Sequence, residues 1–207
     1  MSKRTKLKLV SLFSIILFFT IWILVTDVFH LVKPTSLPSP IVVIKTFYNK
    51  WFEKAPDGST LGVHILTSLQ IAFYGFLAGA IVGVPLGIFM AWFKTFDMAV
   101  KPLFDFVRTI PPIAWIPMMI LWLGIGIKAK AGIVFLSAFI PCVLNSYSGI
   151  KQTSNVHIWV ALTFGASRWT VLRKVAIPSA LPMIFTGLKL SLNSAWTTLV
   201  AAELLGA

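Results

Sequence analysis

The chain has 207 residues, of which 57% are hydrophobic and 12% charged, and its mean hydropathy is +0.89. A soluble domain of this length could not bury that much apolar surface, so the composition predicts a membrane protein. The net charge of +12 raises nucleic acid as an alternative partner, but the basic residues are scattered at the ends of apolar segments. They form no single patch with aromatic residues, so we expect no DNA or RNA partner.

The N-terminal segment predicts a membrane anchor. Basic residues precede an apolar run over Leu9–Val25, which is long enough to span a bilayer and is not followed by a small-residue cleavage site. Residues 1–26 are therefore expected to form a retained signal-anchor span with its N-terminus in the cytoplasm.

Residues 27–60 are mixed in polarity and contain several prolines, so we place this segment on the outer, periplasmic side of the membrane. Leu37-Pro-Ser-Pro40 is expected to start an amphipathic helix over Ile41–Phe52 that lies at the outer interface. Asp57-Gly58 predicts a turn after this helix.

Residues 61–207 are expected to form the core domain, which opens with a second span over about Ser68–Phe93. Small residues recur along this span at four-residue spacing. Such spacing lets a neighbouring helix approach closely, which is how helices associate in lipid. The glycines concerned are Gly75, Gly79, Gly83 and Gly87.

A short loop over Lys94–Lys101 is predicted to return the chain from the inside, and a third span follows over Pro102–Leu123. Arg108 lies near its entry. Pro111, Pro112 and Pro117 interrupt the span, and two interpretations stay open. The prolines break the helix so that freed carbonyls face a water-filled path, or they produce a plain kink that neighbouring helices accommodate.

The fourth span is expected over Ala131–Ile150, with a break at Pro141, and the fifth span runs from Leu181 towards Leu205. Polar residues on these spans either line a path or hydrogen-bond a neighbouring helix. They include Asn145, Ser146, Tyr147 and Ser148 on the fourth span, and Asn193, Ser194, Trp196, Thr197 and Thr198 on the fifth.

Two charges lie on the fifth span, where a charge at the bilayer centre costs about 2.5 to 3.5 kcal/mol. Glu203 falls near the outer end, so it either reaches external water or takes part in gating. Lys189 lies deeper and can extend to the cytoplasmic interface.

Between the fourth and fifth spans, residues 151–180 are expected to form a cytoplasmic helical hairpin. Asn155 is predicted to cap a first helix over Val156–Phe164, Gly165 to supply a left-handed turn, and Ser167 to cap a second helix that Pro178 ends. Two interpretations stay open: the hairpin presses against a soluble partner, or it lies flat on anionic lipid with its basic residues towards the headgroups.

The distribution of charge predicts the topology. With the N-terminus inside, twelve basic residues lie on or near the cytoplasmic side and six outside, which agrees with the positive-inside rule. The sequence therefore predicts an all-α polytopic membrane protein with five spans. Five spans from an inside start leave Ala207 outside, and we expect a sixth span to be missing from the C-terminal end.

No catalytic chemistry is expected from the sequence. His30, His64 and His157 are isolated from other ligand residues and Cys142 is the single cysteine, so we assign no metal site. The chain contains no phosphate-binding glycine loop with its lysine, so it is not expected to hydrolyse ATP.

Three separated stretches together resemble one family. Leu37-Pro-Ser-Pro40 with its following helix, Arg108-Thr-Ile-Pro-Pro-Ile-Ala-Trp-Ile-Pro117 with Leu121-Trp-Leu-Gly-Ile-Gly126, and Gly165-Ala-Ser-Arg-Trp169 with Ile177-Pro178 are similar to the inner-membrane permease subunits of bacterial ABC importers. Within these permeases, the chain resembles the nitrate, sulfonate and taurine group, which also includes permeases for bicarbonate, cyanate and thiamine precursors. The glycine and terminal proline of the family's cytoplasmic loop are thirteen residues apart, as they are here.

The chain departs from the family at the start of this loop. The family usually carries a glutamate six residues before the glycine, followed by two alanines, where this chain has Trp159, Val160 and Ala161. If that glutamate helps to fix the docking contact, the contact here depends on shape and on the basic residues.

The resemblance implies a division of labour among separate proteins. A periplasmic binding protein delivers a small anionic or zwitterionic solute, a dimer of permease subunits forms the path, and two ATPase subunits that bind ATP and magnesium drive it. The residues implied in ATPase coupling are Trp159, Ala161, Gly165, Ala166, Ser167, Arg168, Trp169, Ile177 and Pro178, and the aromatic residues among them have interfacial anchoring in lipid as their alternative.

The candidates for the path or its gating are Arg108, Pro111, Pro112, Trp115, Asn145, Asn193, Trp196 and Glu203. A secondary carrier or channel that acts without an ATPase is the alternative function, although the paired intramembrane charges expected of a carrier are scarce.

Overall fold

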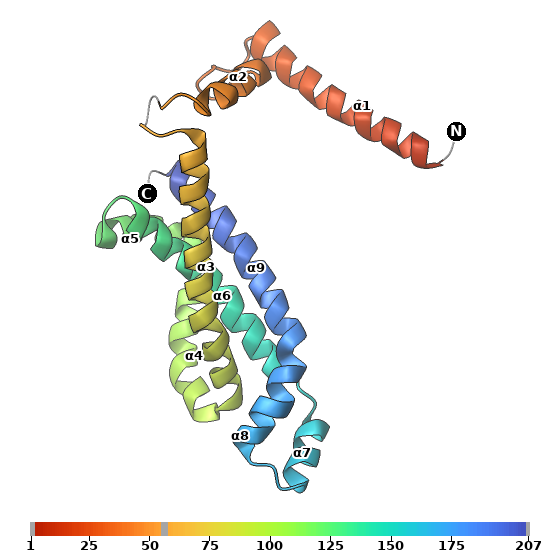
Figure 1. The fold of residues 1–207 in the computed structure, drawn as a ribbon, viewed down its shortest axis with the longest axis vertical. Helices are drawn as coiled ribbons and strands as arrows, with labels where there is room; N and C mark the ends of the chain where they lie inside the picture. The colour runs from red at the N-terminus through yellow and green to blue at the C-terminus, as the bar shows by residue number, and fades with distance from the viewer. Residues whose placement is uncertain (1–2, 55–57, 206–207) are drawn as a thin grey trace. The chain divides into compact units, whose positions relative to one another are not determined.

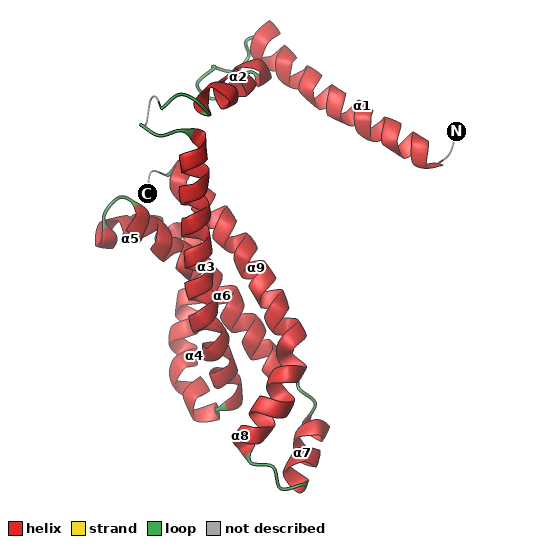
Figure 2. Cartoon of the chain, viewed as in Figure 1, coloured by secondary structure: helices red, strands yellow, loops and turns green. Residues whose placement is uncertain are grey.

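A computed structural model describes residues 3–54 and 58–205 of the chain. These residues form helices and turns, with no strand among them (Figures 1 and 2). Four helices are long and apolar enough to cross a membrane, or five if one bent pair counts as a single span. The predicted all-α polytopic fold is confirmed.

The chain divides into two compact units, Met1–Leu66 and Thr67–Ala207. The first contains α1 (Lys3–Ile23), which continues through the π turn η1 (Leu24–Val28), and α2 (Pro40–Lys50). The apolar stretch Leu7–Val28 has a mean hydropathy of 2.6 and is almost entirely exposed within the unit. Such a surface suits lipid.

The predicted helix start at residues 37–40 is confirmed. Ser39 caps α2 by accepting a hydrogen bond from the backbone N–H of Val42 (3.4 Å), and Pro40 is the first helical residue. The indole Nε1 of Trp22 donates to the carbonyl of Pro38 (3.1 Å), which ties this segment to α1. Asp57 of the predicted turn lies outside the described residues.

The second unit contains α3 (Leu61–Trp92) from Thr67 onward, and this part of α3 packs closely against α6 (Ile127–Lys151). A Cβ added at Gly75 would lie 2.5 Å from Cγ1 of Val134, and one at Gly79 would lie 2.8 Å from Cβ of Ala138. The predicted role of the four-residue glycine spacing, close helix approach, is therefore confirmed.

The predicted loop over Lys94–Lys101 is wrong. Only Phe93 interrupts the helical chain, with extended backbone (φ −104°, ψ 104°), and α4 (Lys94–Thr109) begins directly after it. Asp97 in the first turn favours a helix start there. The charges that suggested a loop lie on an amphipathic helix whose buried residue, Phe104, packs with Met90 and Val143.

The predicted third span does not form one continuous helix. A single 3-10 turn, η2 (Pro112–Trp115), leads into α5 (Ile116–Leu123), and these residues are bent by 88° from α4. Ile110 has an extended backbone (ψ 119°), as expected of a residue before a proline. A plain kink is thus excluded, and the interpretation of a broken helix holds for its geometry.

The last span, α9 (Ile177–Leu204), packs along α6. Gly187 of α9 lies against Asn145 and the carbonyl of Pro141, and Gly149 of α6 lies against Ala180. These contacts between small residues hold the fourth and fifth spans together. Figure 1 shows α3, α6 and α9 side by side, with the short helices α7 and α8 at the end where α4 begins.

Candidate functional site

The predicted hairpin is present between α6 and α9, as α7 (Asn155–Thr163) and α8 (Arg168–Val171). Gly165 has the predicted left-handed conformation (φ +80°), and its N–H donates to the carbonyl of Leu162 (2.9 Å). The hydroxyl of Ser167 accepts from the N–H of Thr170 (3.2 Å), which confirms the predicted cap. The first helix begins one residue earlier than predicted, so Asn155 lies within α7 and Ser154 takes the cap position without a side-chain hydrogen bond.

The prediction that Pro178 ends the second helix is wrong. The chain continues from α8 through the π turn η3 (Leu172–Ala176) into α9, so that Arg168–Leu204 forms one apolar helical stretch of 37 residues. In the π turn the N–H of Ile177 donates to the carbonyl of Leu172, five residues back. This wider turn precedes Pro178, whose ring would otherwise crowd the carbonyl four residues before it.

One side of this continuous arm is anchored in the core. Leu172 and Ala176 are buried in a cluster with Ala91 of α3 and Ile150 of α6. Trp169 at the start of the arm is 50% exposed, and in the rest of the hairpin Phe164 is 88% and Trp159 63% exposed. The hairpin therefore presents aromatic side chains outward, while its second helix continues into the last span.

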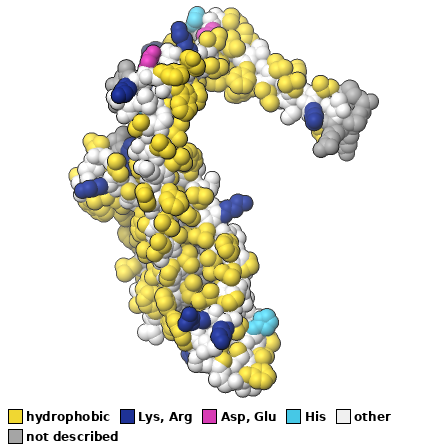
Figure 3. All heavy atoms as spheres, viewed as in Figure 1, with side chains coloured by type: hydrophobic (Ala, Val, Ile, Leu, Met, Phe, Trp, Pro, Cys, Tyr) yellow, Lys and Arg dark blue, Asp and Glu magenta, His cyan; other side chains and the backbone are white. Residues whose placement is uncertain are grey.

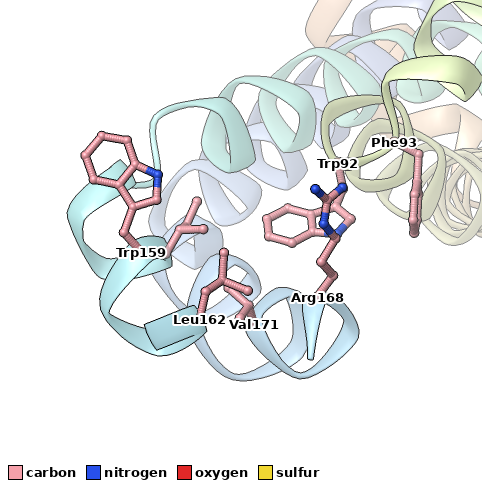
Figure 4. Close-up of a pocket in the computed structure, with 7 residues that line it drawn as sticks. Trp92, Phe93, Trp159, Leu162, Arg168 and Val171 are labelled. Atoms are coloured by element: carbon pink, nitrogen blue, oxygen red, sulfur yellow. The ribbon is translucent and has the colours of Figure 1, made fainter. Parts of the chain in front are cut away.

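A groove of about 260 Å³ separates the hairpin from the turn between α3 and α4. Figure 4 shows Arg168 rising from α8 towards Trp92 and Phe93, with Leu162 of α7 across from them and Trp159 at the outer side. Sequence reasoning missed Trp92 and Phe93. The signal available was an aromatic pair at the end of a span, but its proximity to the hairpin depends on the tertiary fold.

The candidate path residues do not form one site. Arg108 lies on α4, where its Nε donates to Asp105 Oδ1 (2.6 Å), and it lines a small cavity between α4 and α6 with Lys101 and Tyr147. In the same region Tyr147 donates to Asp97 (3.2 Å), a contact that the sequence did not predict.

The broken segment carries a second set of candidates. Pro111 is exposed and Pro112 half-buried, and η2 contacts both α6 and α9. The indole Nε1 of Trp115 is buried and has no hydrogen-bond partner among the described residues. An unpaired buried donor beside a helix break has free capacity to bind a polar group.

In the predicted polar stripe of α9, Asn193, Trp196 and Thr197 are exposed, and Ser194 and Thr198 are half-buried. Ser191, which was not predicted, is fully buried on the same helix beside Cys142, with Oγ and Sγ 3.1 Å apart. Ser191 contacts α6 through Cys142, and the exposed residues of the stripe face away from the core of the subunit.

Asn145 and Glu203 are each bonded within the subunit. The side-chain amide of Asn145 donates to the carbonyl of Pro141 on its own helix (2.8 Å), at the contact with α9. Oε1 of Glu203 accepts from the hydroxyl of Ser68 (2.6 Å), which joins the end of α9 to α3. No group of three His, Cys, Asp or Glu side chains within the described residues could hold a metal ion.

Comparisons with known proteins identify the family. Residues 83–207 match the binding-protein-dependent transport system inner membrane component. The taurine transport system permease protein TauC of Escherichia coli is 34% identical over 197 residues, which cover 95% of this chain and 71% of that protein.

Two further relatives agree. The nitrate import permease protein NrtB of Synechocystis sp. is 33% identical over 175 residues, covering 83% of this chain and 64% of that protein. The putative aliphatic sulfonates transport permease protein SsuC of Bacillus subtilis is 35% identical over 175 residues, which cover 84% of this chain and 62% of that protein. The chain is thus a multi-pass inner-membrane protein that belongs to the binding-protein-dependent permease family of ABC importers.

Proposed function

We propose that two copies of this chain form the translocation path of an importer for a small anionic or zwitterionic solute, driven by a separate ATPase that binds the α7–α8 hairpin. The observation that carries the proposal is the continuous helix from Arg168 to Leu204. Because no loop separates the hairpin from this helix, a force applied to the exposed hairpin would be transmitted to the last span.

Charge and hydropathy support a cytoplasmic position for the hairpin and, with it, for the N-terminus. Lys and Arg side chains gather at the α7–α8 end of the second unit, while apolar side chains cover its flanks (Figure 3). Basic residues concentrate on the cytoplasmic side of membrane proteins. The apolar flanks would contact membrane lipid.

The exposed stripe of α9 supports a path formed with a second copy. Lys189, Asn193 and Thr197 recur at four-residue spacing and are all exposed within the subunit. Facing lipid, the Lys189 ammonium alone would cost about 2.5 to 3.5 kcal/mol near the bilayer centre. A second copy that encloses a water-filled path along this stripe removes that cost, and Trp196 would lie at its edge.

The solute class is proposed from the relatives, whose names refer to taurine, nitrate and aliphatic sulfonates. These solutes share a compact anionic oxygen group. A periplasmic binding protein would deliver such a solute, and ATP with magnesium would bind to the ATPase subunit and not to this chain.

Reconstitution tests the proposal. The chain is placed in liposomes with the ATPase and the binding protein encoded by neighbouring genes, and uptake of labelled taurine, nitrate and an alkanesulfonate is measured with and without ATP and magnesium. We expect uptake only when all three proteins and ATP are present. Replacing Gly165 by Val or Trp169 by Ala should weaken both the complex and the uptake.

Uptake by the chain alone, without the ATPase, would contradict the proposal and favour a secondary carrier or channel. Unchanged complex formation and uptake in both hairpin variants would show that the hairpin is not the coupling element.

A further inference from the structure

We infer that the groove between the hairpin and the α3–α4 turn receives a carboxylate side chain of the ATPase, which pairs with Arg168 between aromatic walls. The inference rests on the proposed function and specifies the chemistry of the docking contact. The permease would supply the positive charge of this contact, and its partner the negative one.

The walls of the groove are apolar and come from three separate elements. Trp92 and Phe93 lie at the end of α3, Ile158 and Trp159 on α7, and Val171 closes the groove from α8. Trp159 is 63% exposed and Phe93 43%, so uncovered aromatic surface lines a cavity of about 260 Å³. Exposed apolar surface that surrounds a concave site is typical of a protein-binding surface.

Arg168 is the one charged residue among those that line the groove. It forms no ion pair with any carboxylate in the described part of the chain, and residues 151–180 contain no acidic residue at all. Its guanidinium points towards Trp92 and Phe93 (Figure 4). The Arg168 side chain is exposed at the groove. An exposed guanidinium that faces a concave site can bind a partner's carboxylate through two parallel, charge-assisted hydrogen bonds.

Among the described residues that line the groove, none carries a carboxylate that could pair with Arg168. Trp159 lines it with an indole ring, and its other lining residues apart from Arg168 are apolar. The carboxylate must therefore come from the partner. An acidic side chain flanked by apolar residues complements both the cation and the ring surfaces.

Lipid fits this groove less well than a protein side chain does. The groove is a concave site between α7, α8 and the end of α3, whereas a bilayer presents a broad, nearly flat layer of headgroups. Arg173 and Lys174 instead lie on the exposed side of the arm with Trp169 and Thr170. Of these residues, the cations Arg173 and Lys174 are the better contacts for anionic headgroups.

A matched pair of charge reversals tests the inference. Arg168→Glu changes the groove, and Arg173→Glu makes the same change of charge on the same arm outside the groove. Binding of the detergent-solubilised permease to its ATPase is measured for the wild-type chain and both variants. We expect Arg168→Glu to weaken binding by about tenfold or more, the effect of losing a charge-assisted hydrogen bond, and Arg173→Glu to change it by less than about threefold.

A second variant reports on the groove without removing Arg168. Trp159→Glu should also weaken binding, because it removes one aromatic wall and places a carboxylate that would repel the partner's acid. Photo-crosslinking from position 158 should then identify an ATPase peptide that contains Asp or Glu. Exchanging that residue for Arg should restore binding of the Arg168→Glu permease.

The outcomes separate the inference from the proposed function. If the wild-type chain binds the ATPase but Arg168→Glu and Arg173→Glu weaken it equally, the groove contact is wrong while the hairpin still couples. Loss of binding to phosphatidylglycerol vesicles by Arg168→Glu, with ATPase binding unchanged, would show that the groove binds lipid and would overturn the inference. Failure of the wild-type chain to bind the ATPase would contradict the proposed function itself.

Discussion

Prolines have opposite effects in two regions of this molecule. At Pro111 and Pro112 the helix stops and the chain turns by 88°, whereas at Pro178 the run of helical residues continues into α9. The residues before the prolines differ accordingly, since Ile110 is extended (ψ 119°) and Ile177 is helical (φ −62°, ψ −49°).

Two causes account for the difference. The first region has adjacent prolines, and each disfavours helical backbone in the residue before it, so Ile110 and Pro111 are both non-helical. The second has one proline, preceded by a π turn that makes room for its ring and by two buried residues, Leu172 and Ala176, that hold the turn in place. Both the number of adjacent prolines and the packing around them therefore decide whether the helix continues here.

The largest effect on stability is expected at the contact between α3 and α6. Gly79→Ala would place a Cβ 2.8 Å from Cβ of Ala138 and 2.9 Å from the backbone nitrogen of Phe139. We expect it to force α3 away from α6 at a cost of about 1 to 3 kcal/mol. Thermal unfolding in detergent, followed by circular dichroism, measures this loss.

The matched control is Gly62→Ala on the same helix, where the nearest atom, in Trp51, would lie at an ordinary 3.6 Å. It should leave the unfolding temperature nearly unchanged. Equal effects of the two substitutions would contradict the account of close packing between α3 and α6.

The broken region can be tested by removing its cause. Replacing Pro111 and Pro112 together by Ala restores two backbone donors and relieves the restriction on Ile110. We expect α4 to extend and the spin-label distance between positions 106 and 121 to increase, with reduced solute uptake. An unchanged distance would mean that packing of η2 against α6 and α9, and not the prolines, maintains the bend.

A smaller effect is expected where α4 begins. Tyr147→Phe removes the hydrogen bond to Asp97 that joins α4 to α6, and leaves the ring on which Lys101 and Lys151 lie, 5.0 Å and 5.5 Å from its centroid. The loss should be about 0.5 to 1.5 kcal/mol. Denaturant unfolding measures it, and a neutral result would show that the bond adds nothing to the packing of α4 on α6.

The smallest effect is expected at the start of the rigid arm. Ser167→Ala removes the cap of α8, a loss of about 1 kcal/mol confined to the first turn. Local hydrogen exchange at residues 168–171 should rise while global stability changes little. Protection equal to that of the wild-type chain would show that the cap is dispensable.

The sequence predicted the turns, the helix caps and the close helix contacts because each depends on a few neighbouring residues. Gly165 and Ser167 determine the hairpin turn through backbone conformation and one capping bond, and the spacing of Gly75 and Gly79 indicates close approach whatever the partner helix is. The start of α2 was predictable from Ser39 and Pro40 for the same reason.

Other features depend on contacts distant in sequence, and the sequence alone did not predict them. The charged residues from Lys94 to Lys101 fit a loop or an amphipathic helix equally well until Phe104 is seen to pack with Val143. Continuation through Pro178 depends on burial of Leu172, and the groove brings Trp92 and Trp159 together from separate helices.

The most direct test of the account is a hinge placed in the rigid arm. The double substitution Val175→Gly and Ala176→Gly destabilises the helix at the π turn by up to about 1 kcal/mol per residue, because glycine has a low helix propensity. It leaves the exposed hairpin residues unchanged. The variant is measured with its ATPase and binding protein in liposomes, for ATPase binding and for solute uptake. We expect ATPase binding to stay within about threefold of the wild-type value while solute uptake falls at least about tenfold, the change that corresponds to about 1.4 kcal/mol. Wild-type uptake in the hinged variant would contradict the claim that this arm transmits the ATPase motion to the last span.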